Sequence, residues 1–262
     1  MIHDNIITPD KLQALATNLI ARHTVDIVLH PNRNIFFIKP DFIDIFRTRV
    51  LPHINYKFVL ITHDSDIPVN ESSIQILDNP YLIKWFGMNC HIIHDKLYPI
   101  PIGIANEIYK HGNKDIILKI HNEKNKKNNL VYCNFDTNTD PNRPIALEYL
   151  KNITFIDIEK NKLPFEDYLR KLSHYKYVIS PPGNSTDCHR IWEAMHVGTI
   201  PICLSSIPLL SFNDCPILFI QKWEDVTEEL LHVNYDLIKS KSTIKSDFLL
   251  YQTLITEVAK IK

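Results

Sequence analysis

The segment with the clearest chemical potential runs from Tyr177 to Leu204 and reads YVISPPGNSTDCHRIWEAMHVGTIPICL. Its composition predicts a strand, a turn, a helix, a second turn and a second strand. Proline and glycine end the first strand, and the small polar residues Asn184, Ser185 and Thr186 are candidate caps for the helix. A helix start offers free backbone N–H groups and the positive end of the helix dipole, which together favour an anion such as a diphosphate.

Two charged side chains of this predicted helix could complete such an anion site. Arg190 could neutralise phosphate charge. Glu193 could accept two hydrogen bonds from the vicinal hydroxyls of a ribose, because a carboxylate only accepts. Two structural alternatives stay open at this stage: Asp187 as a favourable acid in the first turn, and Arg190 with Glu193 as a surface ion pair one turn apart.

The string PPGNSTDCHRIWEAMHVGTIPI resembles the C-terminal signature of exostosin-type glycosyltransferases, family 47, and of their relatives in large DNA viruses. The shared pattern is a Pro-x-Gly turn at Gly183, then Asp187, Arg190 and Glu193-Ala194, and then Gly198-Thr199-Ile200-Pro201. The resemblance implies the GT-B fold, in which two Rossmann-like domains face a cleft and the C-terminal domain binds the donor. It also implies a metal-independent transfer and places Glu193 on the donor ribose.

The resemblance extends the predicted donor site to a loop that follows an upstream strand. Residues 131–150 read VYCNFDTNTDPNRPIALEYL, in which a strand ends at Asn134 and Pro144 starts a helix. In the implied fold this loop faces the diphosphate, and Arg143 is the favoured second cation, while Thr137 and Asn138 also fit a polar surface turn. The residues predicted to bind the donor are Asn134, Arg143, Ser180, Pro182, Gly183, Asn184, Ser185, Asp187, Arg190 and Glu193.

A second polar cluster, His63-Asp64-Ser65-Asp66, directly follows the apolar run FVLIT. The carboxyl ends of parallel strands are where open α/β sheets bind ligands. A sugar transfer with inversion needs a general base for the acceptor hydroxyl. We predict Asp66 as that base, with His63 and Asp64 as catalytic neighbours. Alternatively, the two aspartates cap a turn before Pro68.

The elements that must position these residues alternate between strands and helices. This alternation predicts an α/β protein with mostly parallel sheets. Predicted strands are residues 25–29, 35–38, 58–62, 97–100, 130–133, 153–158, 177–180, 200–204 and 217–220. Predicted helices are residues 9–22, 41–50, 80–86, 114–123, 144–150, 165–174, 187–197, 226–232 and 245–261.

One polar stretch, HNEKNKKNN at residues 121–129, suggests a linker between two halves of the chain. It predicts an acceptor-side domain at 1–123 and a donor-binding domain at 124–262, with the last helix crossing back onto the first domain. The alternative is a helix end followed by a solvated loop within one domain.

Composition and missing motifs exclude several classes of protein. The formal net charge of -1 and the sequence pI of about 6.9 provide no basic field for nucleic acid. No apolar run is long enough to span a membrane. The five widely spaced cysteines predict reduced thiols in a cytoplasmic compartment, the host cytoplasm if the chain is viral. Neither dinucleotide, P-loop nor zinc motifs occur, so no cofactor and no metal are expected.

These features together predict a soluble glycosyltransferase that moves a hexose or pentose from a UDP- or GDP-sugar to a hydroxyl of a glycan or glycoprotein. The transfer is expected to be inverting and metal-independent. Two alternatives remain: a GT-A transferase that holds a divalent metal with Asp64 and Asp66, and a non-catalytic module that binds a nucleotide or a glycan.

Overall fold

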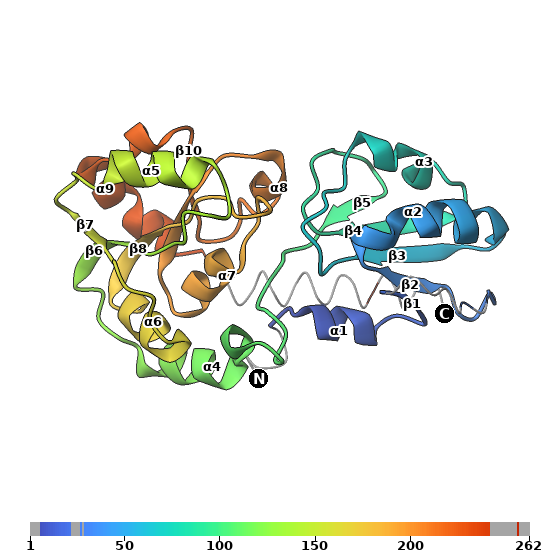
Figure 1. Ribbon diagram of the computed structural model, residues 1–262, viewed down its shortest axis with the longest axis horizontal. Helices are drawn as coiled ribbons and strands as arrows, with labels where there is room; N and C mark the ends of the chain where they lie inside the picture. Colours follow the sequence, from blue (N-terminus) through green and yellow to red (C-terminus); the bar gives the residue numbers. More distant parts are fainter. Residues whose placement is uncertain (1–5, 22–26, 28, 242–255, 257–262) are drawn as a thin grey trace. The chain divides into compact units, whose positions relative to one another are not determined.

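The computed structural model describes residues 6–21, 27, 29–241 and 256. The described chain forms two compact units, one comprising Ile7–Ile102 and the other the residues that follow from Gly103 to 241. Each unit is built on a five-stranded sheet in which every strand pair is parallel (Figure 1). The α/β class predicted from the sequence is therefore confirmed.

The unit comprising Ile7–Ile102 has its strands in the order β1-β2-β3-β4-β5. Two of the inner strands, β2 and β3, are fully buried and largely apolar on both faces, as expected of a parallel sheet that is covered on both sides. The strands are β1 (Asn18–Ile20), β2 (Ile35–Ile38), β3 (Phe58–Thr62), β4 (Leu82–Gly87) and β5 (Leu97–Pro99). The helices and helical turns are α1 (Pro9–Ala14), η2 (Pro40–Phe42), α2 (Ile43–Ile45), η3 (Phe46–Val50), η4 (Leu51–His53), η5 (Glu71–Ser73) and α3 (Ile74–Leu77).

Two helices predicted in this unit are wrong in whole or in part. The helix predicted at 9–22 stops at Ala14, because residues 18–20 instead pair with β2 as a strand. The helix predicted at 80–86 is the strand β4, whose Trp85 and Phe86 are buried beside β3. A short apolar run fits either structure, and only the neighbouring strand decides between them. The strand predicted at 25–29 falls mostly outside the described residues.

The unit that begins at Gly103 has its strands in the order β10-β9-β8-β6-β7. Figure 1 shows α5 and α9 on one side of this sheet and α6 and α7 on the other. The strands are β6 (Asn129–Cys133), β7 (Ile156–Ile158), β8 (Tyr175–Ile179), β9 (Ile200–Leu204) and β10 (Leu218–Ile220). The helices and helical turns are η6 (Lys110–Gly112), α4 (Lys114–Glu123), α5 (Asn142–Leu150), α6 (Phe165–Leu172), α7 (His189–His196), α8 (Ile207–Leu210), η7 (Trp223–Asp225) and α9 (Glu228–Lys239).

The strand order of this second sheet reverses direction between β6 and β8. The chain runs from β6 outward to β7, and then returns to the other side of β6 to continue through β8, β9 and β10. Loops that leave the carboxyl ends of two strands at such a reversal diverge and open a crevice, where doubly wound sheets bind their ligands. The topology therefore directs attention to the loops after β6 and β8.

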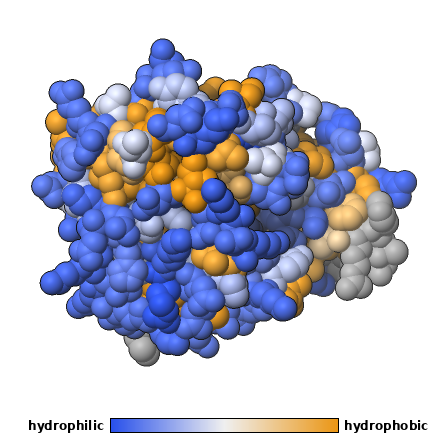
Figure 2. All heavy atoms as spheres, turned by 60° about the vertical axis from the view of Figure 1, so that its left-hand side comes forward, coloured by the Kyte–Doolittle hydropathy of each residue, from blue (hydrophilic) through white to orange (hydrophobic). Residues whose placement is uncertain are grey.

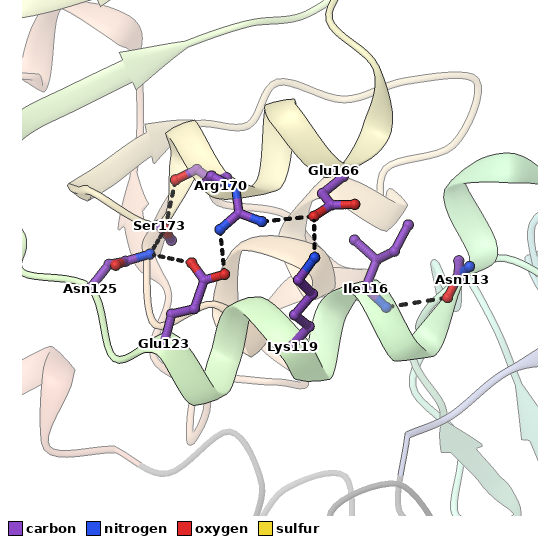
Figure 3. A network of polar contacts seen from close by, with 8 residues as sticks. All are labelled: Asn113, Ile116, Lys119, Glu123, Asn125, Glu166, Arg170 and Ser173. Carbon is purple, nitrogen blue, oxygen red and sulfur yellow. Dashed lines mark hydrogen bonds and ion pairs between the residues drawn. The ribbon is translucent and has the colours of Figure 1, made fainter.

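The two units meet at Ile102–Gly103 rather than at the predicted boundary between residues 123 and 124. The difference arises because α4 packs on α6 through a polar network (Figure 3). Lys119 Nζ and Arg170 Nη2 each lie 2.7 Å from Glu166 Oε1, and Arg170 also pairs with Glu123. Each exposed ion pair contributes little free energy, but together with the packing of α4 on α6 and α7 they place α4 in the second unit.

The predicted linker at 121–129 belongs to the same packed unit. Asn125 Nδ2 donates to Ser173 Oγ at 2.9 Å, and Lys127 Nζ donates to Val197 O and Thr199 Oγ1, each at 2.9 Å. The stretch is polar because its side chains reach backbone and hydroxyl oxygens, so its polarity does not mark a hinge. The predicted C-terminal helix at 245–261 lies outside the described residues.

Exposed apolar side chains of the second unit gather in part on α5 and α9. Figure 2 brings this unit forward and shows apolar side chains gathered over its upper part. The exposed apolar residues of α5 and α9 are Ile145, Tyr149, Val233 and Leu237. Among the described helices, none has the length and hydropathy needed to cross a lipid bilayer.

Candidate functional site

A pocket of about 520 Å³ opens in the unit that begins at Gly103. It lies at the switch point identified above, because its walls include the residue after β6 and the helix that follows β8. Its lining residues are Lys110, His111, Asn134, Lys162, Leu163, Pro164, Phe165, Tyr168, Arg190 and Glu193. A volume of this size suits a small organic ligand such as a nucleotide.

Helix α7 supplies Arg190 and Glu193, two of the charged residues predicted to bind the donor. It begins at His189, and Arg190 and Glu193 follow three residues apart, so both face the same side. The N-cap is the extended residue Cys188, which makes no side-chain capping hydrogen bond. The prediction that Asn184, Ser185 or Thr186 caps this helix is therefore wrong.

The C-terminal end of α7 is closed by a Schellman motif. Gly198 has a φ of +73°, and its N–H donates to Met195 O at 3.0 Å while Thr199 N–H donates to Ala194 O at 2.8 Å. The left-handed conformation explains why glycine stands in the Gly-Thr-Ile-Pro string, since other residues adopt it at a cost. With both ends defined, α7 holds Arg190 and Glu193 at fixed positions in the pocket wall.

The electrostatic environment of these two residues is unusual for a surface helix. Glu193 is only 6% exposed, and burial raises its pKa to about 7 against the opposing effects of the Arg190 cation and the Tyr168 hydroxyl. Burial disfavours the charge of Arg190, but Tyr168, Cys188 and Glu193 together raise its pKa. Arg190 Nε is buried and donates to no oxygen among the described residues. The pocket is therefore lined by a permanent cation, one of whose N–H groups has no acceptor among the described residues.

Tyr168 completes the polar floor from α6. Burial raises the pKa of its phenol, and the Glu193 carboxylate raises it further. The hydroxyl thus stays protonated at neutral pH and can donate a hydrogen bond. Beside it, Leu163, Pro164 and Phe165 form an apolar wall at the start of the same helix.

Arg143, the predicted second cation, lies beneath the turn after β8 and is not among the lining residues. It is only 5% exposed, its Nε donates to Pro182 O at 2.6 Å, and its Nη1 donates to Asp136 O at 2.8 Å. A Cβ atom added at Gly183 would lie 3.2 Å from Arg143 Nη2. Arg143 therefore holds the loop after β6 against the turn after β8, which positions both sides of the switch point.

The other predicted donor residues build this same turn. Ser185 Oγ donates to Asp187 O at 2.6 Å, and the buried Asp187 carboxylate accepts from Trp192 Nε1 at 2.7 Å. Ser180 is buried, and Asn184 is exposed. Of the predicted donor residues, the pocket brings together Asn134, Arg190 and Glu193, and contacts of the rest with a ligand stay predictions.

The predicted catalytic cluster lies in the other unit, at the carboxyl end of β3. His63 is fully buried with Nε2 3.0 Å from Pro101 O, so it belongs to the core. Asp64 has a φ of +64° and lies 3.5 Å from Lys39 Nζ. Asp66 is exposed, and Asn89 Nδ2 donates to its backbone oxygen at 3.3 Å. Among the described residues, three or more His, Cys, Asp or Glu side chains nowhere gather in a metal-binding arrangement.

Sequence reasoning missed the pocket residues outside the two predicted loops. Lys110 and His111 come from η6, and Lys162, Phe165 and Tyr168 come from the segment after β7. The segment after β7 could have been found, since β7 is a neighbour of β6 and its carboxyl end faces the same edge. The position of η6 could not, because it precedes the first strand of this sheet.

Comparison with protein families links this unit to a known group. Residues 148–254 match the family model of the RXYLT1 C-terminal domain. The match supports relation to a glycosyltransferase family and a glycosyltransferase-like function. It spans α6 and α7 and hence Tyr168, Arg190 and Glu193. No curated protein matches the chain.

Proposed function

We propose that this protein transfers a sugar from a nucleotide-diphosphate sugar to a glycan hydroxyl, with the donor bound in the pocket beside β6 and α7. One observation carries this proposal. The pocket unites Asn134 with Arg190 and Glu193, and the last two lie within residues 148–254, which match the RXYLT1 C-terminal domain. The transfer is metal-independent and inverting, and the domains adopt the GT-B arrangement.

The charges of the pocket suit a sugar-linked diphosphate. The cations Lys110, Lys162 and Arg190 line it together with a single carboxylate, Glu193. The Arg190 guanidinium, which lines the pocket, donates to a phosphate oxygen. Glu193 accepts from the ribose hydroxyls, and Phe165 offers an apolar surface to the base.

The cations of the pocket would stabilise the negative charge that develops on the diphosphate during the transfer. As the bond between the anomeric carbon and the diphosphate breaks, negative charge grows on the leaving oxygen. Cations held in place before the reaction stabilise that charge more than mobile water does. A pentose donor is favoured, because the family match points to a xylosyltransferase-type enzyme.

Donor binding is tested by thermal shift with UDP, GDP, UDP-xylose and other nucleotide-sugars, because a bound donor raises the apparent melting temperature. We expect Arg190→Ala to weaken donor affinity by about ten- to hundredfold, the usual value of a charged hydrogen bond. Arg170→Ala is the matched control, since Arg170 lies on α6 and pairs with Glu123 and Glu166 outside the pocket.

Two outcomes would contradict the proposal. The first is a wild-type protein that no nucleotide or nucleotide-sugar stabilises. The second is equal donor affinity in Arg190→Ala and Arg170→Ala, which would remove the donor from this pocket. Binding without any release of sugar from the donor would favour the non-catalytic module.

A further inference from the structure

We propose that His111 is the general base that takes the proton of the acceptor hydroxyl. This inference rests on the proposed function, because it assigns a catalytic residue to the same pocket. His111 lies on the pocket wall with Arg190 and Glu193, within one unit of the fold. It differs from the sequence-based prediction of Asp66, which lies in the other unit.

The turn that carries His111 is tightly constrained. Tyr109 N–H donates to Asn106 O at 2.9 Å, and Gly112 N–H donates to Tyr109 O at 2.9 Å. A Cβ on Gly112 would lie 2.0 Å from Asn106 O, so only glycine allows the turn to close onto that backbone. The Tyr109 ring stacks on the His111 ring with their centroids 5.5 Å apart. These contacts define the backbone of the turn, and the Tyr109 ring lies against the imidazole.

The other titratable groups of the pocket are less suited to accept this proton. Glu193 is buried on the floor beside Arg190 and has its ribose role in the proposed function. Tyr168 keeps its proton because its pKa is raised. Lys110 and Lys162 are exposed lysines, whose side chains offer hydrogen-bond donors and no acceptor. Among the described lining residues, His111 remains as the accessible base.

The surroundings of His111 favour its neutral form. Burial lowers its pKa below the usual 6.5, and the Lys162 cation lowers it further. The His189 ring of α7 lies 6.1 Å away, with its Nδ1 2.8 Å from Gly103 O. Lys110 adjoins His111 in η6. A neutral imidazole has one nitrogen lone pair, which can accept a proton.

A ring nitrogen of His111 takes the proton of the acceptor hydroxyl while its oxygen bonds to the anomeric carbon of the donor. The bond from that carbon to the diphosphate oxygen breaks, and its electron pair leaves with the nucleoside diphosphate. The imidazolium then releases the proton to water, which restores the neutral base.

The test compares His111→Gln, Asp66→Asn and His232→Gln in the full chain, with the nucleotide-sugar found by thermal shift. Donor hydrolysis, in which water replaces the acceptor, is followed by nucleoside diphosphate release between pH 5 and 8. His232 is the control because it lies on α9, away from the pocket lining. We expect His111→Gln to lower kcat by about 10²- to 10⁴-fold, as for loss of a general base. Donor affinity should stay within about twofold, since a base contributes little to ground-state binding.

The pH profile separates a catalytic from a structural role. In the wild type, kcat should fall once the pH drops below 6.5, the usual pKa of a histidine side chain. This acid limb of the pH profile should vanish in His111→Gln. Unchanged kcat in His111→Gln, or an acid limb lost in Asp66→Asn instead, would overturn the inference and leave the proposed function standing. Failure of every nucleotide-sugar to bind the wild type would overturn both.

Discussion

At the scale of single residues, burial decides the chemistry of the pocket. Glu193 and Arg190 lie three residues apart, and that spacing alone also fits an exposed ion pair. The structure instead buries the carboxylate and raises its pKa to about 7. Such a group costs folding free energy when ionised, which is the kind of cost that functional sites bear.

Glu193 should make the stability of the protein depend on pH. Its folded-state pKa of about 7 lies above the usual value of 4.5 for a glutamate, so the folded protein binds more protons than the unfolded chain between these pH values. The stability that the protonated Glu193 side chain contributes to the folded state is fully present below pH 4.5 and is lost as the pH rises through 7. We expect wild-type stability relative to Glu193→Gln to fall by up to about 3 kcal/mol between pH 4.5 and 8.

Urea unfolding at several pH values measures this difference. Glu229→Gln is the control, because Glu229 is exposed on α9. A free-energy difference between wild type and Glu193→Gln that stays constant over this pH range would show that the carboxyl titrates normally in the folded protein.

At the scale of elements, α7 and η6 determine where the pocket residues stand. A glycine lies at or just after the end of each element. Gly198 adopts the left-handed conformation after α7, and Gly112 allows η6 to contact the backbone of Asn106. Lys127 adds to the end of α7 by donating to Val197 O. Burial lowers the pKa of Lys127 to about 7, because the charged amino group is poorly solvated there. The contact joins the polar segment before β6 to the end of α7.

Substitution of Gly198 should destabilise the unit that contains the pocket. Gly198→Ala forces a Cβ into a positive-φ position and should lower the free energy of unfolding by about 1 kcal/mol. Gly198→Asn should cost less, because asparagine tolerates this conformation better. Denaturant unfolding measures both variants. Equal stability of Gly198→Ala and wild type would mean that the helix end is not fixed by the Schellman motif.

At the scale of the whole molecule, the chain has two units with separate apolar cores. One core groups residues of β6, β8, β9 and β10 with α5 and α9, and the other unit has cores on both faces of its own sheet. Because all lining residues of the pocket belong to one unit, donor binding should reduce local opening mainly in that unit.

Hydrogen exchange should locate the donor on the chain. We expect UDP-sugar binding to protect amides at residues 110–112, 134, 162–168 and 188–193, where the pocket wall is formed. Protection should be weaker over the sheet of Ile7–Ile102, since a bound ligand suppresses local opening around its own site. Protection confined to residues 7–102 would contradict a donor site beside β6 and α7.

The sequence by itself determined the α/β class, several strands and helices to within a few residues, and the pair Arg190 and Glu193. These features depend on local periodicity and on a motif within one strand-turn-helix unit, which a linear string contains. It also suggested Arg143 near the turn after β8, although as a ligand for phosphate.

Only the tertiary structure decided the rest, because those features depend on contacts between distant segments. Pairing with β3 made residues 82–87 a strand, and packing on α6 and α7 moved the unit boundary from 123 to 102. The same packing brought His111 and Tyr168 to Arg190, although each comes from a different element. No pattern within a short stretch of sequence encodes such a meeting, since it arises when the sheet order reverses at β6 and β8.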